Sequence, residues 1–375
     1  MELSGALSSY AQEELTPSIG TKFAGVQLTE ILKDAAQLRD LAITVSRRGV
    51  VFFNNQELTV ADHKSIAQAL GSAVGKPQDS HLHRHVLLNG SGVTLQDIAE
   101  AVDDEVSVVS STDRIRVMRN REHTKSLIPG SHGWHSDTFW EKIPSDYTVL
   151  HMLDVPEIGG DTLWASGYAV YEKLSPQWQR MLDGTTALCA TKDYDHLRQL
   201  MRYDFGGGGR GSPENSGTKL EAIQPVIRTN PVTGWKSVFA AAHAIEHGYI
   251  IELTPYENNV VKEYLLKLIT HNADLQVRHR WTKNDVAIWD NRSVFHRVNF
   301  DFEGYRRAHR VVSIGEKPFF SPNSLSRSDG LARRRAYELE QTTKNATHTE
   351  QKSDDSSKRK VETNVIQLPV QRARL

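Results

Sequence analysis

The first quarter of the chain carries hydrophobic patterns typical of helices, with one strand-like run between them. From Leu28 to Arg47, apolar residues recur every three or four positions, which predicts one or two amphipathic helices. The apolar run Gly49 to Phe53 is short and rich in β-forming residues, so it predicts a buried strand. Thr59 and Asp62 have the spacing of a capping box, which indicates that a second helix begins there.

Beyond residue 100 the pattern changes to short runs that alternate or cluster as β-strands do. The predicted strands are 105–109, 114–118, 146–152, 225–229, 237–240, 285–289 and 310–314. Helical patterns interrupt them at 167–182 and 257–269. Many short strands with few helices predict a mainly β fold, a sandwich or jelly roll with flanking helices.

Three segments differ from this pattern. Residues 1–20 are small and polar, and we expect a loose N-terminal arm. The glycine-rich run 206–217 predicts a flexible loop, a lid or an insertion, because it lacks the Gly-Lys-Ser/Thr ending of a phosphate-binding loop. From residue 326 to 375 the sequence is polar and charged without apolar periodicity, which predicts a disordered tail. One folded domain is therefore expected over 21–325.

Charge and composition narrow the range of partners. The chain has 45 basic and 46 acidic side chains and a net charge of −1, so it lacks the positive field that drives nucleic-acid binding. No apolar run reaches the roughly 18 residues of a membrane span, and no membrane partner is expected. The single cysteine, Cys189, cannot form an intramolecular disulfide, and we expect it to be a small buried side chain.

The expected location is the cytoplasm. An alternative comes from the last three residues of the sequence, Ala373-Arg374-Leu375, which fit the small-basic-leucine form of a peroxisomal address. Coincidence is a serious competing explanation for so short a signal.

The strongest candidate for chemistry is a His-x-Asp pair, His135 and Asp137. On an extended segment the side chains repeat every two residues, so the imidazole and the carboxylate lie on the same face. A third ligand from a separate strand completes a facial triad for a non-haem Fe(II) ion, and His296 is the candidate. With 16 histidines and 46 acidic residues, one such pair is expected by chance, and a structural His–Asp hydrogen bond is the alternative.

Three arginines follow His296. On a strand, Arg306 and Arg310 share a face while Arg307 points away. Two guanidinium groups inside an apolar barrel are costly unless they pair with anions, and a planar guanidinium binds an organic acid in bidentate fashion. A surface charge cluster is the alternative.

Several ordered motifs then resemble one family. They are Trp134-His135-Ser136-Asp137, Gly159-Gly160-Asp161-Thr162-Leu163-Trp164, residues 225–234 (PVIRTNPVTG), residues 284–292 (NDVAIWDNR) and Gly315-Glu316-Lys317-Pro318. Together they resemble the Fe(II)/2-oxoglutarate-dependent dioxygenases of the taurine dioxygenase (TauD/TfdA) family, over roughly Gly25 to Phe320.

The resemblance implies a double-stranded β-helix (a jelly roll) and assigns roles to individual residues. It implies that His135, Asp137 and His296 bind Fe(II). Thr162 and Arg306 match residues that hold 2-oxoglutarate, and Arg310 matches an arginine near the substrate anion. The interval between His296 and the arginines leaves open that Arg307 or Arg310 holds the co-substrate instead.

The substrate side departs from the family pattern. His85 fits a substrate-contacting histidine, but Val86 stands where a proline is usual, and Ser131 replaces an amide side chain. Taurine itself is therefore not the expected substrate. Alternation also puts His81, His83 and His85 on one face, formally a second metal site, although ordinary pocket lining is the simpler interpretation.

The implied reaction uses Fe(II), 2-oxoglutarate and O2, and releases succinate and CO2. The favoured substrate is a small organic anion: a sulfonate, a sulfate ester or an aryloxyacetate. A natural-product hydroxylase or desaturase with the same iron chemistry is the first alternative, and a catalytically silent jelly-roll metal-binding protein is the second. A small-molecule substrate is the expected partner, and the sequence leaves open whether the protein forms a homo-oligomer.

Overall fold

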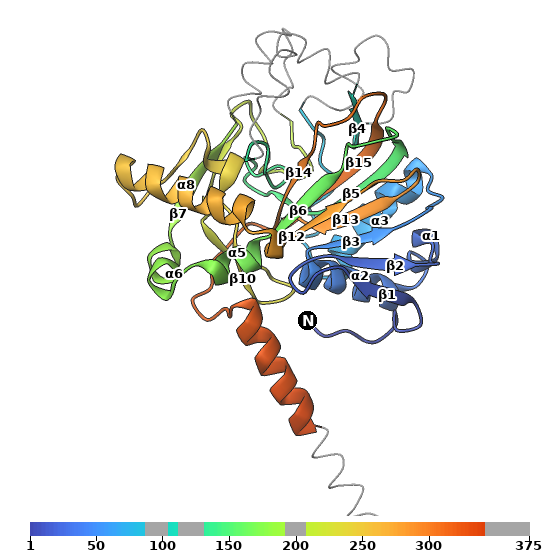
Figure 1. The fold of residues 1–375 in the computed structure, drawn as a ribbon, viewed down its shortest axis with the longest axis horizontal. Coiled ribbons are helices and arrows are strands. Elements are labelled where there is room, and N and C mark those ends of the chain that lie inside the picture. The colour runs from blue at the N-terminus through green and yellow to red at the C-terminus, as the bar shows by residue number, and fades with distance from the viewer. Residues whose placement is uncertain (87–103, 112–130, 192–207, 342–375) are drawn as a thin grey trace, which may run out of the picture. The chain divides into compact units, whose positions relative to one another are not determined.

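The computed structural model describes residues 1–86, 104–111, 131–191 and 208–341 (Figure 1). The chain divides into a compact unit, Met1–Ser326, and a second unit, Arg327–Leu375. None of the helices in these described segments is long and apolar enough to cross a membrane.

A large twisted sheet forms the first layer of the main unit (Figure 1). Within the described residues its strand order is β1 (Ala11–Glu14), β2 (Thr21–Ala24), β3 (Val50–Phe53), β13 (Val286–Asp290), β5 (Ser145–Asp154), β15 (Arg307–Ile314) and β4 (Val106–Ser110). The strands pair antiparallel except β2 and β3, which pair in parallel. β13 and β5 are neighbours within this sheet, and all of β13 and the first eight residues of β5 are buried.

Smaller sheets form the second layer. Their orders are β12 (Gln276–His279), β6 (Thr162–Ser166) and β14 (Val294–Val298); β11 (Tyr249–Ile250), β7 (Thr186–Ala190) and β8 (Glu221–Pro225); and β10 (Lys236–Val238) with β9 (Ile227–Thr229). Phe52 and Trp289 of the large sheet share one buried cluster with Trp164 of β6 and Val294 of β14. The large sheet therefore packs against the sheet of β12, β6 and β14 over an apolar interior, in agreement with the predicted jelly roll.

Helices flank these sheets in the described segments. They are α1 (Leu28–Ile31), α2 (Ala35–Arg48), α3 (Val60–Ala73), α5 (Gly167–Lys173), α6 (Pro176–Leu182) and α8 (Pro255–His271), with 3-10 turns at Ala242–Ile245 and Ala273–Leu275. Of these, α2 and α3 pack on one face of the large sheet, and α5 packs against β10 and β14. The predicted capping box of Thr59 and Asp62 is present at the start of α3. The single helix predicted over 167–182 is two helices, because Ser175 caps a new helix whose first residue is Pro176.

Most predicted strands are confirmed within one to three residues at their ends. Each of the runs at 105–109, 146–152, 225–229, 285–289 and 310–314 overlaps an observed strand, and the run 237–240 overlaps β10. The predicted strand at 114–118 lies outside the described residues.

The N-terminal segment is not a loose arm, contrary to the prediction for residues 1–20. The carboxylate of Asp40 on α2 accepts hydrogen bonds from the backbone N–H groups of residues 4–6, at 2.8 to 3.1 Å. Leu7 and Ile19 are buried, and β1 pairs with β2. The segment has few apolar residues, but two of them, Leu7 and Ile19, are buried in the domain. The buried carboxylate of Asp40, which lies outside the segment, holds its first residues in place.

The glycine-rich segment, predicted to be a flexible loop, is described from residue 208 onward and is held in place there. Arg210 donates two hydrogen bonds to the buried carboxylate of Glu141, at 2.6 and 2.8 Å. The side-chain amide of Asn215 exchanges hydrogen bonds with the backbone of Ile143. The ion pair of Arg210 with Glu141 and the buried amide of Asn215 therefore hold a segment whose glycine-rich composition predicts backbone flexibility.

The predicted disordered tail begins with a helix. Residues 327–341 are helical, and Arg334 forms an ion pair with Glu338 one turn later, at 2.6 Å. This stretch is rich in Ala, Leu, Arg and Glu, which have high helix propensity even where no apolar face is buried. The rest of the predicted tail, including the tripeptide 373–375, lies outside the described residues.

Three histidines meet on the outer face of the large sheet, under α3. His63 of α3 bonds the backbone oxygen of Val149 through Nε2, at 2.9 Å, and its ring lies 6.2 Å from that of His151 on β5. His309 of β15 stands opposite His151 in the strand register. Burial lowers the pKa of His63 to about 3 and that of His151 to about 4, with smaller contributions from the neighbouring imidazoles.

We expect acid to destabilise the protein through this histidine cluster. Because the folded pKa of His63 lies below the unfolded value of about 6.5, stability is full above that value and falls as the pH drops towards 3. From pH 7 to pH 5, His63 alone contributes a loss of about 2 kcal/mol in the free energy of unfolding. Urea unfolding at pH 7 and at pH 5 measures this difference in the free energy of unfolding. His63→Asn should reduce the loss by about this amount, while His151 keeps its own contribution. His81→Asn, at an exposed position, is the control for the substitution itself.

Candidate active site

His135, Asp137 and His296 converge in the interior of the jelly roll. The Oδ1 atom of Asp137 lies 3.9 Å from Nε2 of each histidine, and the three ligand atoms all lie within 4.8 Å of one another. A first-row divalent ion bonds nitrogen and oxygen at about 2.0–2.2 Å, so ligands in adjacent positions lie about 3 Å apart, and small side-chain movements would bring these three atoms to one ion. In the described part of the chain, no other group of three such residues is this close.

Backbone pairing brings the two imidazoles together. His135 and His296 form an isolated antiparallel bridge, with N–H to O distances of 3.1 and 2.8 Å, and their ring centroids are 4.2 Å apart. Directly after Asp137, Thr138 adopts a positive φ of 53°, which is strained for a β-branched residue. Ser145 holds this bend by bonding the backbone oxygen of Asp137 and the hydroxyl of Thr138.

Both histidines of the triad are neutral, and His135 presents an unprotonated nitrogen to its centre. Nδ1 of His135 bonds the backbone oxygen of Gly133 at 2.8 Å, which fixes Nδ1 as the donor and leaves the Nε2 lone pair facing Asp137. Burial lowers the pKa of His135, and burial followed by the neighbouring His135 lowers the pKa of His296 to about 3. Both imidazoles are therefore neutral at physiological pH, the state that binds a metal.

Asp137 is ionised and strongly hydrogen-bonded. Burial acts to raise the pKa of its carboxyl group, but Arg310, followed by the two histidines, outweighs that effect and holds the pKa well below its ordinary value. Nη1 of Arg310 donates to Oδ1 at 2.6 Å, and the hydroxyl of Thr148 donates to Oδ2 at 2.9 Å. From the sequence, Arg310 is expected near a substrate or co-substrate anion, and in the structure it bonds the acidic member of the triad.

Arg306 and Thr162 form a second buried pair. Nη2 of Arg306 donates to the Thr162 hydroxyl at 3.4 Å, and Nε donates to the backbone oxygen of Gly160 at 3.1 Å. The indole N–H of Trp281 also donates to Thr162, at 2.9 Å. Thr162 and Arg306 are 2% and 4% exposed, so a guanidinium and a hydroxyl meet inside the protein, as an anion-binding site requires.

Arg307 points away from this pair, as strand alternation predicts. It forms an ion pair with Asp154 on the neighbouring strand, at 2.7 Å, and its side chain is 26% exposed. This placement excludes the alternative that Arg307 holds a ligand beside the triad.

His85 lies close enough to the triad to interact with the charge of Asp137, whereas Ser131 has no hydrogen bond to a triad residue within the described residues. Burial lowers the pKa of His85 well below its ordinary value, and the charge of Arg310 adds to that effect. The ring of His85 lies 6.2 Å from that of Trp140. A second metal site at His81, His83 and His85 does not form, because His81 is exposed and His83 bonds Glu141 at 3.1 Å.

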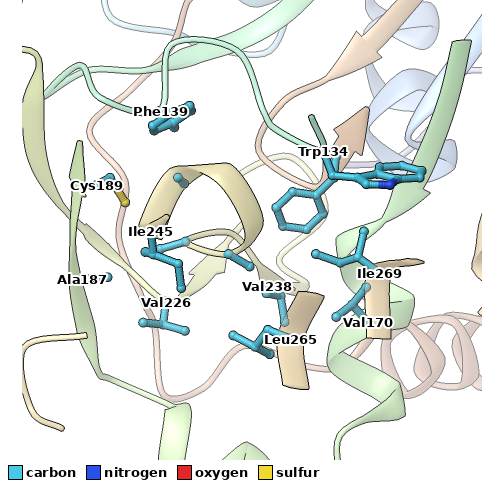
Figure 2. Close-up of a cluster of buried hydrophobic side chains, with 14 of the residues drawn as sticks. Trp134, Phe139, Val170, Ala187, Cys189, Val226, Val238, Ile245, Leu265 and Ile269 are labelled. Atoms are coloured by element: carbon cyan, nitrogen blue, oxygen red, sulfur yellow. The ribbon is translucent and has the colours of Figure 1, made fainter. Parts of the chain in front are cut away.

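Large apolar side chains surround the triad segment. Trp134 and Phe139, which flank the His-x-Asp pair, belong to a buried cluster with residues of α5, β7 and α8 (Figure 2). Cys189 lies in the same cluster as a buried free thiol whose pKa is raised by burial, which confirms its expected packing role. This cluster supports one side of the triad segment with closely packed apolar side chains.

Comparisons with known proteins identify the family. The family described as taurine catabolism dioxygenase TauD, TfdA family, matches residues 11–313. This chain belongs to the TauD/TfdA family. The match includes all three triad residues and the pair formed by Thr162 and Arg306. The protein is therefore a 2-oxoglutarate-dependent dioxygenase with a His-Asp-His metal-binding triad, which removes the silent binding protein from consideration.

Individual relatives agree with this family. The chain is 40% identical to the alpha-ketoglutarate-dependent dioxygenase btcD of Neocamarosporium betae, over 87% of this chain and 96% of that protein. It is 28% identical to the alpha-ketoglutarate-dependent sulfonate dioxygenase of Saccharomyces cerevisiae, over 82% of this chain and 67% of that protein. A crystal structure of a taurine dioxygenase from Burkholderia xenovorans superposes with a TM-score of 0.60 at 24% identity, covering 84% and 92% of the two chains, which supports the fold.

Proposed function

We propose that the triad binds Fe(II) and that the enzyme oxygenates a small organic anion of the sulfonate, sulfate ester or aryloxyacetate class. The observation that carries this proposal is the convergence of two neutral imidazoles and one carboxylate, with Asp137 and His296 buried and a guanidinium in contact with the same carboxylate. Two histidines and one carboxylate are the donor set of non-haem Fe(II) oxygenases. On an octahedral ion they leave three coordination positions open.

In this proposal, Arg306 and Thr162 bind the distal carboxylate of 2-oxoglutarate. A planar guanidinium binds a carboxylate through two parallel hydrogen bonds, and the adjacent hydroxyl supplies a third. The buried setting strengthens these bonds and excludes water that would otherwise compete for the carboxylate.

The bound iron supplies the activation of O2 that is coupled to oxidation of 2-oxoglutarate to succinate and CO2. The chain contributes orientation and exclusion of water. Asp137 and the two histidines present unprotonated donors at neutral pH, and the packed apolar residues around Trp134 keep water from that side of the site.

Arg310 and His85 are the proposed contacts for the substrate anion. Arg310 is charged and lies against the triad, and His85 is buried close enough for that charge to lower its pKa. The similarity to the sulfonate dioxygenase of Saccharomyces cerevisiae supports an anionic substrate. A charge-assisted hydrogen bond contributes about 1.5–3 kcal/mol, so we expect an anion to bind about 10–100 times more tightly than its neutral analogue.

A substrate screen tests the proposal. Succinate release is measured with Fe(II) and 2-oxoglutarate in the presence of organosulfonates, sulfate esters or aryloxyacetates, each paired with its neutral ester or amide. Sulfite, phenol or aldehyde release identifies oxygenation next to the heteroatom. The proposal is supported if the anions stimulate turnover and the neutral partners do not. Stimulation only by larger, uncharged compounds contradicts it and favours the natural-product alternative.

A further inference from the structure

We propose that Thr148 and Asn291 are positioning residues that make Asp137 a ligand through one oxygen only. The inference rests on the proposed metal centre and concerns residues that the sequence analysis did not assign. Thr148 is on β5, and Asn291 is in the turn between β13 and β14. Both side chains are buried, and together they link Asp137 to the indole of Trp289.

The orientation of the Asn291 amide is fixed by its partners. Its Oδ1 atom accepts from the backbone N–H of Asp137 at 3.0 Å and from the indole N–H of Trp289 at 2.9 Å. Both partners can only donate, so this atom must be the oxygen. The Nδ2 group therefore faces the other side, where it donates to the Thr148 hydroxyl at 2.8 Å and to the backbone oxygen of Asp146 at 3.3 Å.

This orientation determines the direction of the Thr148 hydroxyl. Because the Thr148 oxygen accepts from Asn291, its hydrogen is available for Oδ2 of Asp137, 2.9 Å away. The chain of hydrogen bonds therefore runs in one direction, from Trp289 and Asn291 through Thr148 to the carboxylate.

The result is a carboxylate with two different oxygens. Oδ2 accepts from Thr148, whereas Oδ1 faces both histidine Nε2 atoms at 3.9 Å. Oδ1 also accepts from Arg310, and an ionised carboxylate oxygen has lone pairs for two partners. A carboxylate held in this way would bind an ion through Oδ1 and would leave one more coordination position for other ligands than a chelating carboxylate does.

The test is metal binding by the purified full chain, using Co(II) without oxygen or 2-oxoglutarate. Thr148→Val removes the hydroxyl and keeps the shape of the side chain, and Thr148→Ser retains the hydroxyl. We expect Thr148→Val to weaken Co(II) binding about 10–100-fold, the range for loss of a partner of a metal ligand. Infrared difference spectra of ¹³C-aspartate-labelled protein should show a narrower carboxylate stretching splitting, because both Asp137 oxygens become available.

The matched control is Thr44→Val. Its buried hydroxyl bonds the backbone oxygen of Asp40 at 2.7 Å, on α2, so the same substitution removes a buried hydrogen bond that does not involve the triad. The proposal is supported if Thr148→Ser and Thr44→Val retain wild-type affinity and splitting while Thr148→Val changes both. If circular dichroism shows that Thr148→Val is unfolded, Thr148→Ala replaces it in the same measurements.

Two results overturn the inference, and they are distinguishable. Wild-type affinity and wild-type splitting in a folded Thr148→Val or Thr148→Ala protein show that Thr148 does not position the ligand, while the metal centre itself stands. Failure of the wild-type chain to bind Co(II) overturns the proposed metal centre and this inference with it.

Discussion

Replacement of His135 by alanine is expected to abolish succinate production from 2-oxoglutarate. The variant retains Asp137 and His296 but loses the imidazole that Gly133 orients towards them. Losing one of three protein ligands removes several kcal/mol of metal binding, so we expect turnover to fall at least about 1000-fold. Succinate is measured under saturating Fe(II) and 2-oxoglutarate, and Co(II) binding is measured in parallel.

His271→Ala is the matched control, because His271 is exposed at the last residue of α8. It should retain wild-type turnover and Co(II) affinity. Full turnover by His135→Ala in the Fe(II)-supplemented assay contradicts the assignment of His135. Circular dichroism of both variants separates loss of the metal from loss of the fold.

Local patterns predicted the parts of the fold that depend on neighbouring residues. Strand alternation placed Arg306 inside and Arg307 outside, and the structure agrees. The capping-box spacing of Thr59 correctly located the start of α3. Both inferences need only the geometry of a single element.

The errors arise where distant residues decide the outcome. The N-terminal segment is ordered by Asp40, and the glycine-rich loop by Glu141, partners that are more than thirty residues away in each case. Composition predicts how flexible a segment is when it is isolated. In the folded protein, a buried carboxylate that accepts several hydrogen bonds can hold the same segment in one conformation. No periodicity in the sequence marks such a partner.

At the candidate site, too, local sequence patterns are informative, whereas contacts between residues far apart in the sequence are not predicted. The triad was found from the His-x-Asp spacing together with the resemblance, whereas the roles of Thr148 and Asn291 were missed. A signal was available for Thr148, because it shares the inner strand face with the apolar Leu150 and Met152. A buried polar side chain beside apolar neighbours must find a hydrogen-bond partner, and here that partner is Asp137.

The pair of adjacent arginines allows a sharp test of co-substrate binding. We expect Arg306→Gln to raise the KM for 2-oxoglutarate about 100-fold, because it removes a buried guanidinium that donates to Thr162 and is proposed to bind the distal carboxylate. The kcat at saturating 2-oxoglutarate should fall less. Initial rates of succinate release over a range of 2-oxoglutarate concentrations measure both constants.

Arg307→Gln is the control, since it removes the same charge one residue later from a partly exposed ion pair with Asp154. Surface ion pairs contribute about 0–1 kcal/mol, so the KM for 2-oxoglutarate should stay within a few-fold of wild type. Equal increases in KM for both variants would indicate a general electrostatic effect of positive charge on the approach of the dianion. An increase for Arg306→Gln alone supports direct recognition, because both variants lose one positive charge but only Arg306 faces the buried hydroxyl of Thr162.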